Sequence, residues 1–401
     1  MADSTATSGH IGRRLREIRT WRGMTIKALA ELSGYSAAYL SMIERGQRTV
    51  ERKATVEAFA EALRVAPSEL TGSPLLMEGA SQGHAAVANL RTALGEFDFG
   101  DADGDSAVWD DVAARVAKVN ELGPQAEYVV LAELLPELLR DLYASLEGPR
   151  HREALMGLAR CYKWSLSACK NLGFPDLAHV AALRIRDVSH QLAGPEWVGL
   201  AAYARAQAIG SGARERAGML AERAAAEIAP HVDRIEVAEI YGMLHLVAAL
   251  AATARGKLDT ATDHVSEAAE IAARPGVGDR NFMHLWFGRG NVSFWETALA
   301  VEAGEGGRAV KIARSVDPSV IPSSRSRQGM WWIDIGRGLA MERATRDEAV
   351  RAFRRAEDLV PQITYANPWV RENVTSLLTH ARRNAGGREL RRLAYRLGIA
   401  G

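Results

Sequence analysis

The sequence is poor in cysteine, with only Cys161 and Cys169 among its 401 residues. Two cysteines cannot build the disulfide framework of a small secreted scaffold, and a reducing compartment fits this usage. No His/Cys pattern has the spacing of a zinc site, so we expect no metal. The chain is long enough for two or more domains with ordinary hydrophobic cores.

An excess of one charge is also missing. The chain has 50 Lys and Arg against 49 Asp and Glu, which gives a net charge of +1. This balance excludes a uniformly basic chain of the kind that coats nucleic acid. The basic excess is local instead, because residues 1–72 carry eleven Lys and Arg against eight Asp and Glu.

Targeting signals and catalytic motifs are absent as well. The start of the chain lacks a basic-then-apolar order, and the most apolar run, Val237–Ala254, contains Glu239 and His245. There is no phosphate-binding Gly-Lys-Ser/Thr loop, no His-Glu-x-x-His and no nucleophile elbow. We therefore expect a cytoplasmic protein that is not an enzyme, has no membrane span and needs no cofactor.

Two short helices and a tight turn are predicted between Thr25 and Gly46. Thr25 is a good N-cap for a first helix with apolar residues at helical spacing. Gly34 supplies the left-handed residue that a sharp turn requires, and Ser36 caps a second helix that buries Leu40. In such a unit one helix projects from a small core, so that it can enter the DNA major groove.

The surrounding residues resemble the helix-turn-helix domain of Cro/repressor-type (XRE family) bacterial regulators. The matches are Ile11-Gly-Arg-Arg-Leu-Arg-Glu-Ile-Arg19, Gly34-Tyr35-Ser36, Tyr39-Leu40-Ser41 and Ile43-Glu44-Arg45-Gly46. The resemblance implies a helix-turn-helix domain over residues 9–72, with a structural ion pair between Glu44 and Arg19. The family often has Gln where this chain has Ile26 and Ala37, so direct base readout is weakened.

The expected partner is a double-stranded DNA operator. Ala37 can touch a thymine methyl, and the helix also presents polar side chains to base edges. Arginines and a lysine that follow are placed for phosphates. The predicted DNA-binding residues are Thr25, Ser36, Ala37, Tyr39, Ser41, Arg45, Arg48, Arg52 and Lys53. In the alternative interpretation Tyr39 packs in the domain and the basic residues form an ordinary solvated face.

A linker is predicted over residues 73–107. It contains one expected helix at 84–97 and an acidic, Gly-broken loop at 98–106 without apolar periodicity. The alternating aspartates of that loop lack the glycine and terminal glutamate of a calcium site.

The rest of the chain, 108–401, is predicted to be all-α and repetitive. Pairs of small or apolar residues spaced by seven recur along it, each followed by a proline. Small residues at these positions let antiparallel helices approach closely. The pattern predicts a tetratricopeptide-like solenoid of helical hairpins, whose marks are Ala178…Ile185, Ala217…Ala224, Ala261…Ala268, Ala309…Val316 and Ala349…Ala356.

This layout resembles actinobacterial regulators and, in architecture only, the peptide-pheromone receptors of Gram-positive bacteria. The resemblance implies that the solenoid senses an effector, for which a peptide or a small molecule is expected. A homodimer is expected for a different reason, because one head makes few base contacts and two heads on neighbouring half-sites would restore affinity. The arginine-rich stretch 382–396 is one candidate dimer surface, and a solvated tail is the alternative. Projecting the repeat register predicts ligand-facing residues, namely Arg160, Lys163, Met243, Leu246, Asn291, Phe294, Trp331 and Asp334. Arg160 and Lys163 suit a carboxylate, and Asn291 suits a peptide backbone, whereas the aromatic and aliphatic residues fit a core equally well.

Two functions follow from these observations. The first is a ligand-responsive, sequence-specific transcriptional regulator. The alternative is a protein-interaction scaffold whose head is a DNA-tethering or antitoxin-like module and which has no small ligand.

Overall fold

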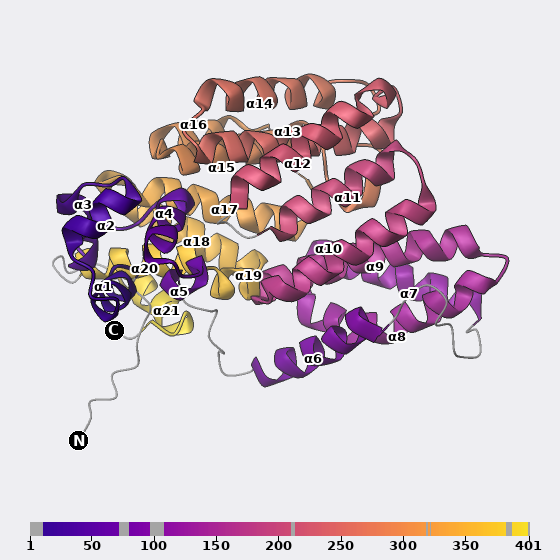
Figure 1. The fold of residues 1–401 in the computed structure, drawn as a ribbon, viewed down its shortest axis with the longest axis horizontal. Coiled ribbons are helices and arrows are strands. Elements are labelled where there is room, and N and C mark those ends of the chain that lie inside the picture. The colour runs from indigo at the N-terminus through magenta and orange to yellow at the C-terminus, as the bar shows by residue number, and fades with distance from the viewer. Residues whose placement is uncertain are drawn as a thin grey trace. The chain divides into compact units, whose positions relative to one another are not determined.

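A computed structural model describes residues 11–71, 80–96, 108–209, 213–317, 320, 322–381 and 387–399. Within these ranges the secondary structure is entirely helical, as predicted (Figure 1). The acidic loop predicted at 98–106 lies outside the described residues, as do Arg382 and Arg383 of the predicted dimer surface.

The chain forms two compact units that do not follow the sequence in order. The head unit comprises Met1–Met77, Glu296–Ser315 and Gly329–Gly401, and the hairpin unit comprises Glu78–Trp295 and Val316–Gln328. The predicted boundaries at 72 and 107 separate the N-terminal helices from the solenoid, whereas the head unit groups those helices with the C-terminal ones.

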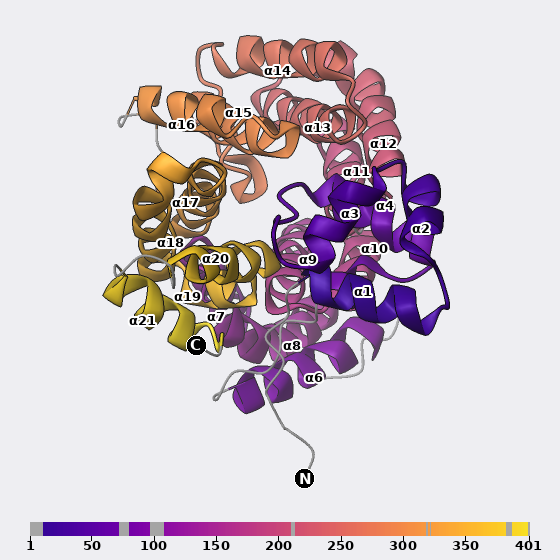
Figure 2. The same cartoon turned by 90° about the vertical axis from the view of Figure 1, so that its left-hand side faces the viewer.

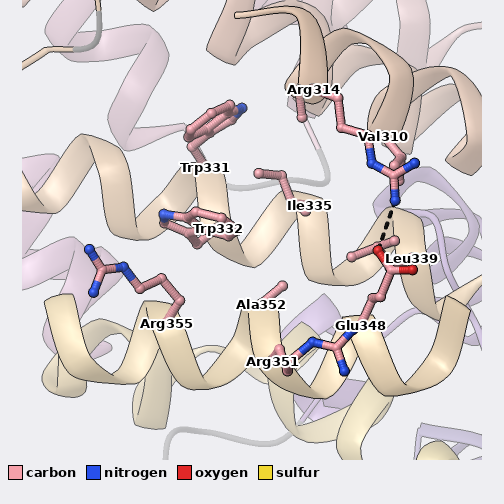
Figure 3. A pocket seen from close by; sticks show the side chains of 11 residues that line it. Val310, Arg314, Trp331, Trp332, Ile335, Leu339, Glu348, Arg351, Ala352 and Arg355 are labelled. Atoms are coloured by element: carbon pink, nitrogen blue, oxygen red, sulfur yellow. Dashed lines mark hydrogen bonds and ion pairs between the residues drawn. The ribbon is translucent and has the colours of Figure 1, made fainter. Parts of the chain in front are cut away.

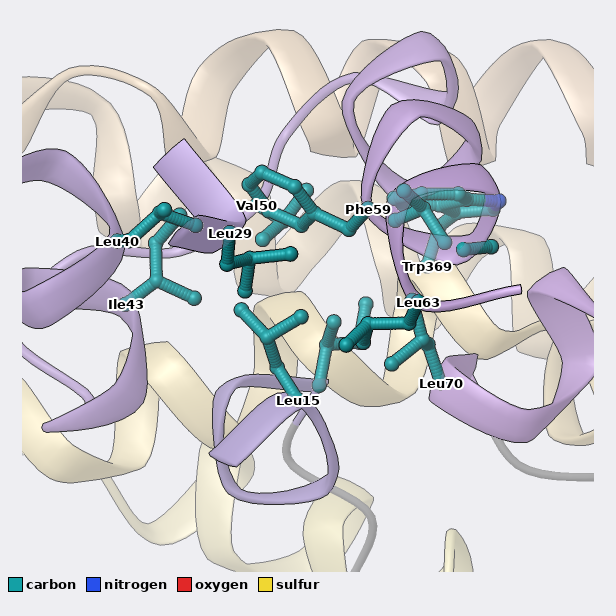
Figure 4. Packing of buried hydrophobic residues seen from close by; sticks show 12 residues of the cluster. Leu15, Leu29, Leu40, Ile43, Val50, Phe59, Leu63, Leu70 and Trp369 are labelled. Atoms are coloured by element: carbon teal, nitrogen blue, oxygen red, sulfur yellow. The ribbon is translucent and has the colours of Figure 1, made fainter. Parts of the chain in front are cut away.

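The head consists of the first five helices and has its own hydrophobic core. These helices are α1 (Ile11–Trp21), α2 (Ile26–Ser33), α3 (Ala37–Glu44), α4 (Lys53–Leu63) and α5 (Pro67–Thr71). Their apolar faces meet around Leu15, Leu29, Leu40 and Phe59, all fully buried (Figure 4). Trp369, from the C-terminal part of the chain, belongs to the same cluster.

The other helices of the head unit come from the end of the chain. Figure 2 shows α17, α18, α20 and α21 gathered together. Their bounds, with the connecting helices, are α15 (Arg289–Ala303), α16 (Gly306–Ser315), α17 (Arg325–Ala340), η7 (Arg343–Thr345), α18 (Arg346–Leu359), α19 (Pro361–Ala366), α20 (Pro368–Ala381) and α21 (Arg388–Arg396).

The hairpin unit is a succession of helices in which, from α7 to α14, each α-helix packs on the next (Figure 1). They are α6 (Ala80–Glu96), α7 (Trp109–Leu122), η1 (Gly123–Gln125), α8 (Tyr128–Ala144), η2 (Ser145–Glu147), α9 (His151–Leu172), α10 (Pro175–Leu192), α11 (Pro195–Ala208), α12 (Arg214–Ile228), η4 (Ala229–His231), α13 (Ile235–Ala254), α14 (Leu258–Ala272) and η5 (Phe282–His284). The predicted linker helix exists as α6, but it packs on α8 and buries Val87, Leu90 and Leu94.

The repeating small residues lie where two helices of a hairpin meet. The first mark of each pair falls on α10, α12, α14, α16 and α18, and all five alanines are buried. Gly218, which follows Ala217 on α12, approaches α13 so closely that an added Cβ would lie 2.6 Å from the Cβ of Ala251. The predicted hairpin architecture is confirmed by this packing, although Val316 follows the end of α16.

One described helix, α13, is long and apolar enough to cross a membrane. Of its most apolar window, 78% is buried inside the protein, and α13 packs against both α12 and α14. It is therefore placed as a core helix, in agreement with the prediction from Glu239 and His245.

Candidate nucleic-acid interface

The turn between α2 and α3 has the geometry that its sequence predicts. Gly34 adopts a left-handed conformation with φ of 75°, which is unfavourable for residues that carry a Cβ. The Thr25 hydroxyl accepts a hydrogen bond from the backbone N–H of Ala28 at 3.1 Å. The Ser36 hydroxyl accepts one from the N–H of Tyr39 at 3.2 Å. Both helix starts are thus capped by side chains.

An ion pair fixes the end of α3 to α1. Arg19 donates from Nε to Glu44 Oε1 at 2.6 Å and from Nη2 to Oε2 at 2.9 Å, and its Nη1 donates to the carbonyl of Met24 at 2.6 Å. The hydrogen bond with Glu44 raises the pKa of Arg19. The predicted structural role of these two residues is confirmed, and neither guanidinium nor carboxylate is presented to DNA.

The start of α3 is open to solvent. Ser36, Ala37 and Ala38 are exposed, while Leu40 and Ile43 on the opposite side are buried in the head core. In helix-turn-helix proteins the N-terminal residues of the second helix contact base edges. Ala38 was not predicted from the sequence, although its position beside Ala37 on the first turn is the signal that identifies it.

Tyr39 packs partly into the head. Its ring stacks on Tyr35 with centroids 5.4 Å apart, and Tyr35 in turn meets Phe59 edge-on at 5.2 Å. Burial raises the pKa of Tyr39. The guanidinium of Arg48 lies 5.0 Å from the Tyr39 ring centroid. Tyr39 therefore packs between the core of the head and its exposed surface, and it orients Arg48 by a cation–π contact.

The segment after α3 presents exposed polar side chains. Arg45, Gln47 and Arg48 are all exposed, and Arg45 donates from Nε to the carbonyl of Ser41 at 3.1 Å. Gln47 was missed by the sequence reasoning, although an amide between two arginines is a group that reads adenine edges well. Lys27, exposed on the first turn of α2, was missed too.

Arg52 and Lys53 lie differently from the other predicted phosphate ligands, because they bind the C-terminal helices of the head unit. Arg52 donates from Nε to the carbonyl of Glu302 at 2.7 Å. The backbone N–H of Lys53 donates to Glu302 Oε2 at 3.1 Å, and its ammonium lies 3.6 Å from Oε1. In this arrangement both residues anchor the head.

Glu302 belongs to a buried charge network with α17. Arg337, 3% exposed, donates to Glu302 Oε1 and to Asp334 Oδ1, both at 2.9 Å, and to the carbonyl of Glu51 at 3.0 Å. The two carboxylates raise the pKa of Arg337 against the effect of burial. Asp334, predicted to face a ligand, is held in this network.

The start of the head is fixed in a second place. The backbone N–H of Ile11 donates to Glu372 Oε2 at 3.2 Å, and Glu372 is 1% exposed on α20. Burial raises the pKa of Glu372 to about 7, against the opposing effect of that hydrogen bond. The head is thus joined to the C-terminal helices by ionisable groups as well as by Trp369.

In the hairpin unit the predicted ligand residues Arg160 and Lys163 lie in a cluster of cations and aromatic rings. Lys163 Nζ lies 3.2 Å from the Trp164 ring centroid and donates to the carbonyl of His284 at 3.4 Å. Burial lowers the pKa of Lys163, and the charge of Arg327 lowers it further. Burial, with Lys163 and Arg160, lowers the pKa of His284 to about 4.

Asn291 borders this cluster, because its side-chain oxygen accepts a hydrogen bond from Arg327. Within the described part of the chain neither Arg160 nor Lys163 has a carboxylate partner. The remaining predicted ligand residues are buried: Met243 and Leu246 at 0%, Phe294 at 5% and Trp331 at 7%. For Met243, Leu246 and Phe294 this burial favours a role in packing.

Comparisons with known proteins agree with the head geometry. Residues 10–71 match the model of a helix-turn-helix domain. The chain is 46% identical over 54 residues to the HTH-type transcriptional repressor RghR of Bacillus subtilis (strain 168), covering 14% of this chain and 40% of that protein. It is 35% identical over 83 residues to the uncharacterized HTH-type transcriptional regulator RghRB of the same organism, covering 19% and 60%.

Among solved structures, Bacillus thuringiensis PlcR in complex with the peptide PapR7 and DNA aligns with 69% of this chain and 97% of its own, at 15% identity and a TM-score of 0.29. The chain spans less than two thirds of the length of the two curated relatives. The match of the family model to residues 10–71 confirms the predicted helix-turn-helix domain.

Proposed function

We propose that the protein is a sequence-specific DNA-binding transcriptional regulator that works in the cytoplasm. The observation that carries this proposal is the exposed start of α3, which Ser36 caps, on a helix whose end the Arg19–Glu44 pair fixes to α1. Ser36, Ala37, Ala38 and Gln47 would meet base edges, and Arg45 and Arg48 would meet phosphates.

We also propose that the protein binds its operator as a homodimer. One short recognition helix with alanines at its first two positions makes few base contacts. Two heads on half-sites roughly 34 Å apart would double those contacts. Sedimentation with and without operator DNA tests this, and a 1:1 complex on a palindromic site would contradict it.

The helical part is proposed to bind a peptide or small-molecule effector near Arg160, Lys163 and Asn291. Support comes from the electrostatics of this cluster: burial and the charge of Arg327 lower the pKa of Lys163, and burial with the charges of Lys163 and Arg160 lowers the pKa of His284. Among the described residues, neither Arg160 nor Lys163 has a carboxylate partner. Burying such groups is costly unless an anion neutralises them. An anionic group of the effector, such as a peptide carboxylate, would fill that role.

The DNA proposal can be tested without knowing the operator. A binding site is first selected from random duplex DNA with the full chain, and affinities are then measured by fluorescence anisotropy. Ala37→Glu places a negative charge at the base-facing surface, yet an acid in the first turn of a helix stabilises that helix. We expect the affinity to fall at least about tenfold, because like charges across an interface cost several kcal/mol.

Ser68→Glu is the matched control, because it adds the same charge to the first turn of α5, where Ser68 is exposed. It is expected to leave affinity within about threefold, in line with a remote surface charge. Equal losses in both variants would show that α3 is not the recognition helix, and failure to select any sequence would refute specific DNA binding.

A further inference from the structure

The head unit contains an open pocket between α16, α17 and α18, with a volume of about 540 Å³ (Figure 3). This volume lies in the range of small-molecule sites. The floor is apolar and comes mainly from α17, and Ala352 faces it from α18. The apolar lining residues are Val310, Ala313, Trp331, Trp332, Ile335, Leu339 and Ala352.

The rim of the pocket is positively charged. It carries Arg314, Arg351 and Arg355 but only one carboxylate, Glu348. Glu348 Oε2 accepts from Arg314 Nη2 at 2.8 Å, so that pair is neutral. In the part of the chain that the structure describes, Arg351 and Arg355 are exposed and have no carboxylate partner. Figure 3 shows Arg355 beside Trp332, at the end of the pocket away from the ion pair.

We propose that this pocket binds a small amphipathic carboxylate, with its apolar body on the two tryptophans and its carboxylate on Arg355 beside Trp332. Arg351, which extends toward Glu348 in Figure 3, adds positive charge to the same rim. Each part of the ligand has a counterpart in the pocket. An apolar body gains by covering Trp332 and the aliphatic floor, and an arginine fork matches a carboxylate in shape and charge. The surplus of two guanidinium groups disfavours an amine of the same size.

This site is separate from the cation cluster of the hairpin unit, and the inference goes beyond the proposed function. It has a direct relation to the head, however, because α17 carries residues of both. Trp331, Ile335 and Leu339 line the pocket, whereas Asp334 and Arg337 on the same helix bind the network that holds Glu51 and Glu302. A ligand that prefers one position of α17 thereby acts on the anchor of the head.

The test uses the full chain, no DNA, and octanoate as the probe. Isothermal titration calorimetry is run with octanoate, with 1-octanol, which lacks the charge, and with octyltrimethylammonium, which has the opposite charge. We expect saturable binding of octanoate that is stronger than that of either analogue. Arg351→Ala with Arg355→Ala should weaken it about tenfold or more, the effect of losing charge-assisted hydrogen bonds.

The matched control is Arg391→Ala with Arg392→Ala, which removes the same charge from exposed positions of α21. It should leave octanoate binding unchanged. Ala352→Leu keeps every charge and fills part of the pocket, so it should also weaken octanoate binding. Circular dichroism checks the fold of each variant. No saturable binding, equal binding of octyltrimethylammonium, or equal effects of the two arginine pairs would each overturn the proposal.

Because no operator is needed, a failure here leaves the DNA proposal intact. Conversely, octanoate binding by a chain that selects no DNA sequence would refute the DNA proposal alone.

Discussion

Replacing Glu302 by Gln should loosen the whole head unit. Glu302 is 3% exposed and accepts from Arg337 Nη2, while Oε2 accepts from the backbone N–H of Lys53. The glutamine oxygen can still accept one of these hydrogen bonds. What is lost is the negative charge, which leaves Arg337 with Asp334 as its partner.

The magnitude follows from that burial. Breaking a buried ion pair from one side typically costs about 3–5 kcal/mol, and the remaining Asp334 contact puts Glu302→Gln at about 3 kcal/mol. Native-state hydrogen exchange read by mass spectrometry measures this unit by unit. A loss of 3 kcal/mol corresponds to roughly 150-fold faster exchange of the protected amides in α4 and α17, while α13 in the hairpin unit serves as an internal reference.

Glu305→Gln is the control. Glu305 pairs with Arg308 at 2.9 Å, but both side chains are in contact with solvent, at 39% and 63% exposure. Surface pairs contribute about 0–1 kcal/mol, so exchange should change by less than about fivefold. If both glutamine variants exchange alike, the network does not hold the head and the reasoning above is wrong.

Three further outcomes are expected. Glu372→Gln should make the stability of the head unit less sensitive to pH. The pKa of the Glu372 carboxyl in the folded protein, about 7, lies above its ordinary value of 4.5. The contribution of Glu372 to folding stability is therefore fully present below pH 4.5 and is lost as the pH rises through 7. Urea unfolding should find the variant about 3 kcal/mol more stable than the parent at pH 8 but similar near pH 4; a constant difference would contradict this. Arg48→Ala should weaken DNA binding evenly across sequences and reduce the slope of log K against log salt by about 0.9, and an unchanged slope would remove Arg48 from the phosphate contacts. Trp369→Ala should destabilise the head unit by about 3 kcal/mol or more, seen as faster exchange in α1; unaltered α1 exchange would show that the head core is complete without it.

Local features of the head were predictable from the sequence because they depend on neighbouring residues. The caps at Thr25 and Ser36, the left-handed Gly34 and the periodic core of α3 are set within a few positions. The pairing of Arg19 with Glu44 came from a family resemblance, and the structure confirms it. Helical hairpins were predictable for a similar reason, since small residues spaced by seven mark one helix face.

Long-range contacts were not predictable in this way. Nothing near Lys53 in the sequence indicates that a carboxylate 249 residues later binds its backbone. Trp369 likewise resembles any tryptophan of a solenoid helix until the fold brings it to Phe59 and Leu63. The repeat register predicted that Trp331 and Asp334 both face a ligand. In the structure Trp331 lines a pocket, whereas Asp334 accepts a hydrogen bond from Arg337 in the buried charge network.

The discontinuous head unit has a consequence for biosynthesis. A ribosome releases the first five helices early, but Glu302, Arg337 and Trp369 emerge only after roughly 230 to 300 further residues, or about 12–60 s later at ordinary elongation rates. Throughout that interval Ile11 and the Trp369-facing side of the head core lack their final partners. A nascent or prematurely terminated chain therefore carries the recognition helix without the C-terminal residues that anchor the head. The head is complete only when translation has reached the C-terminal helices.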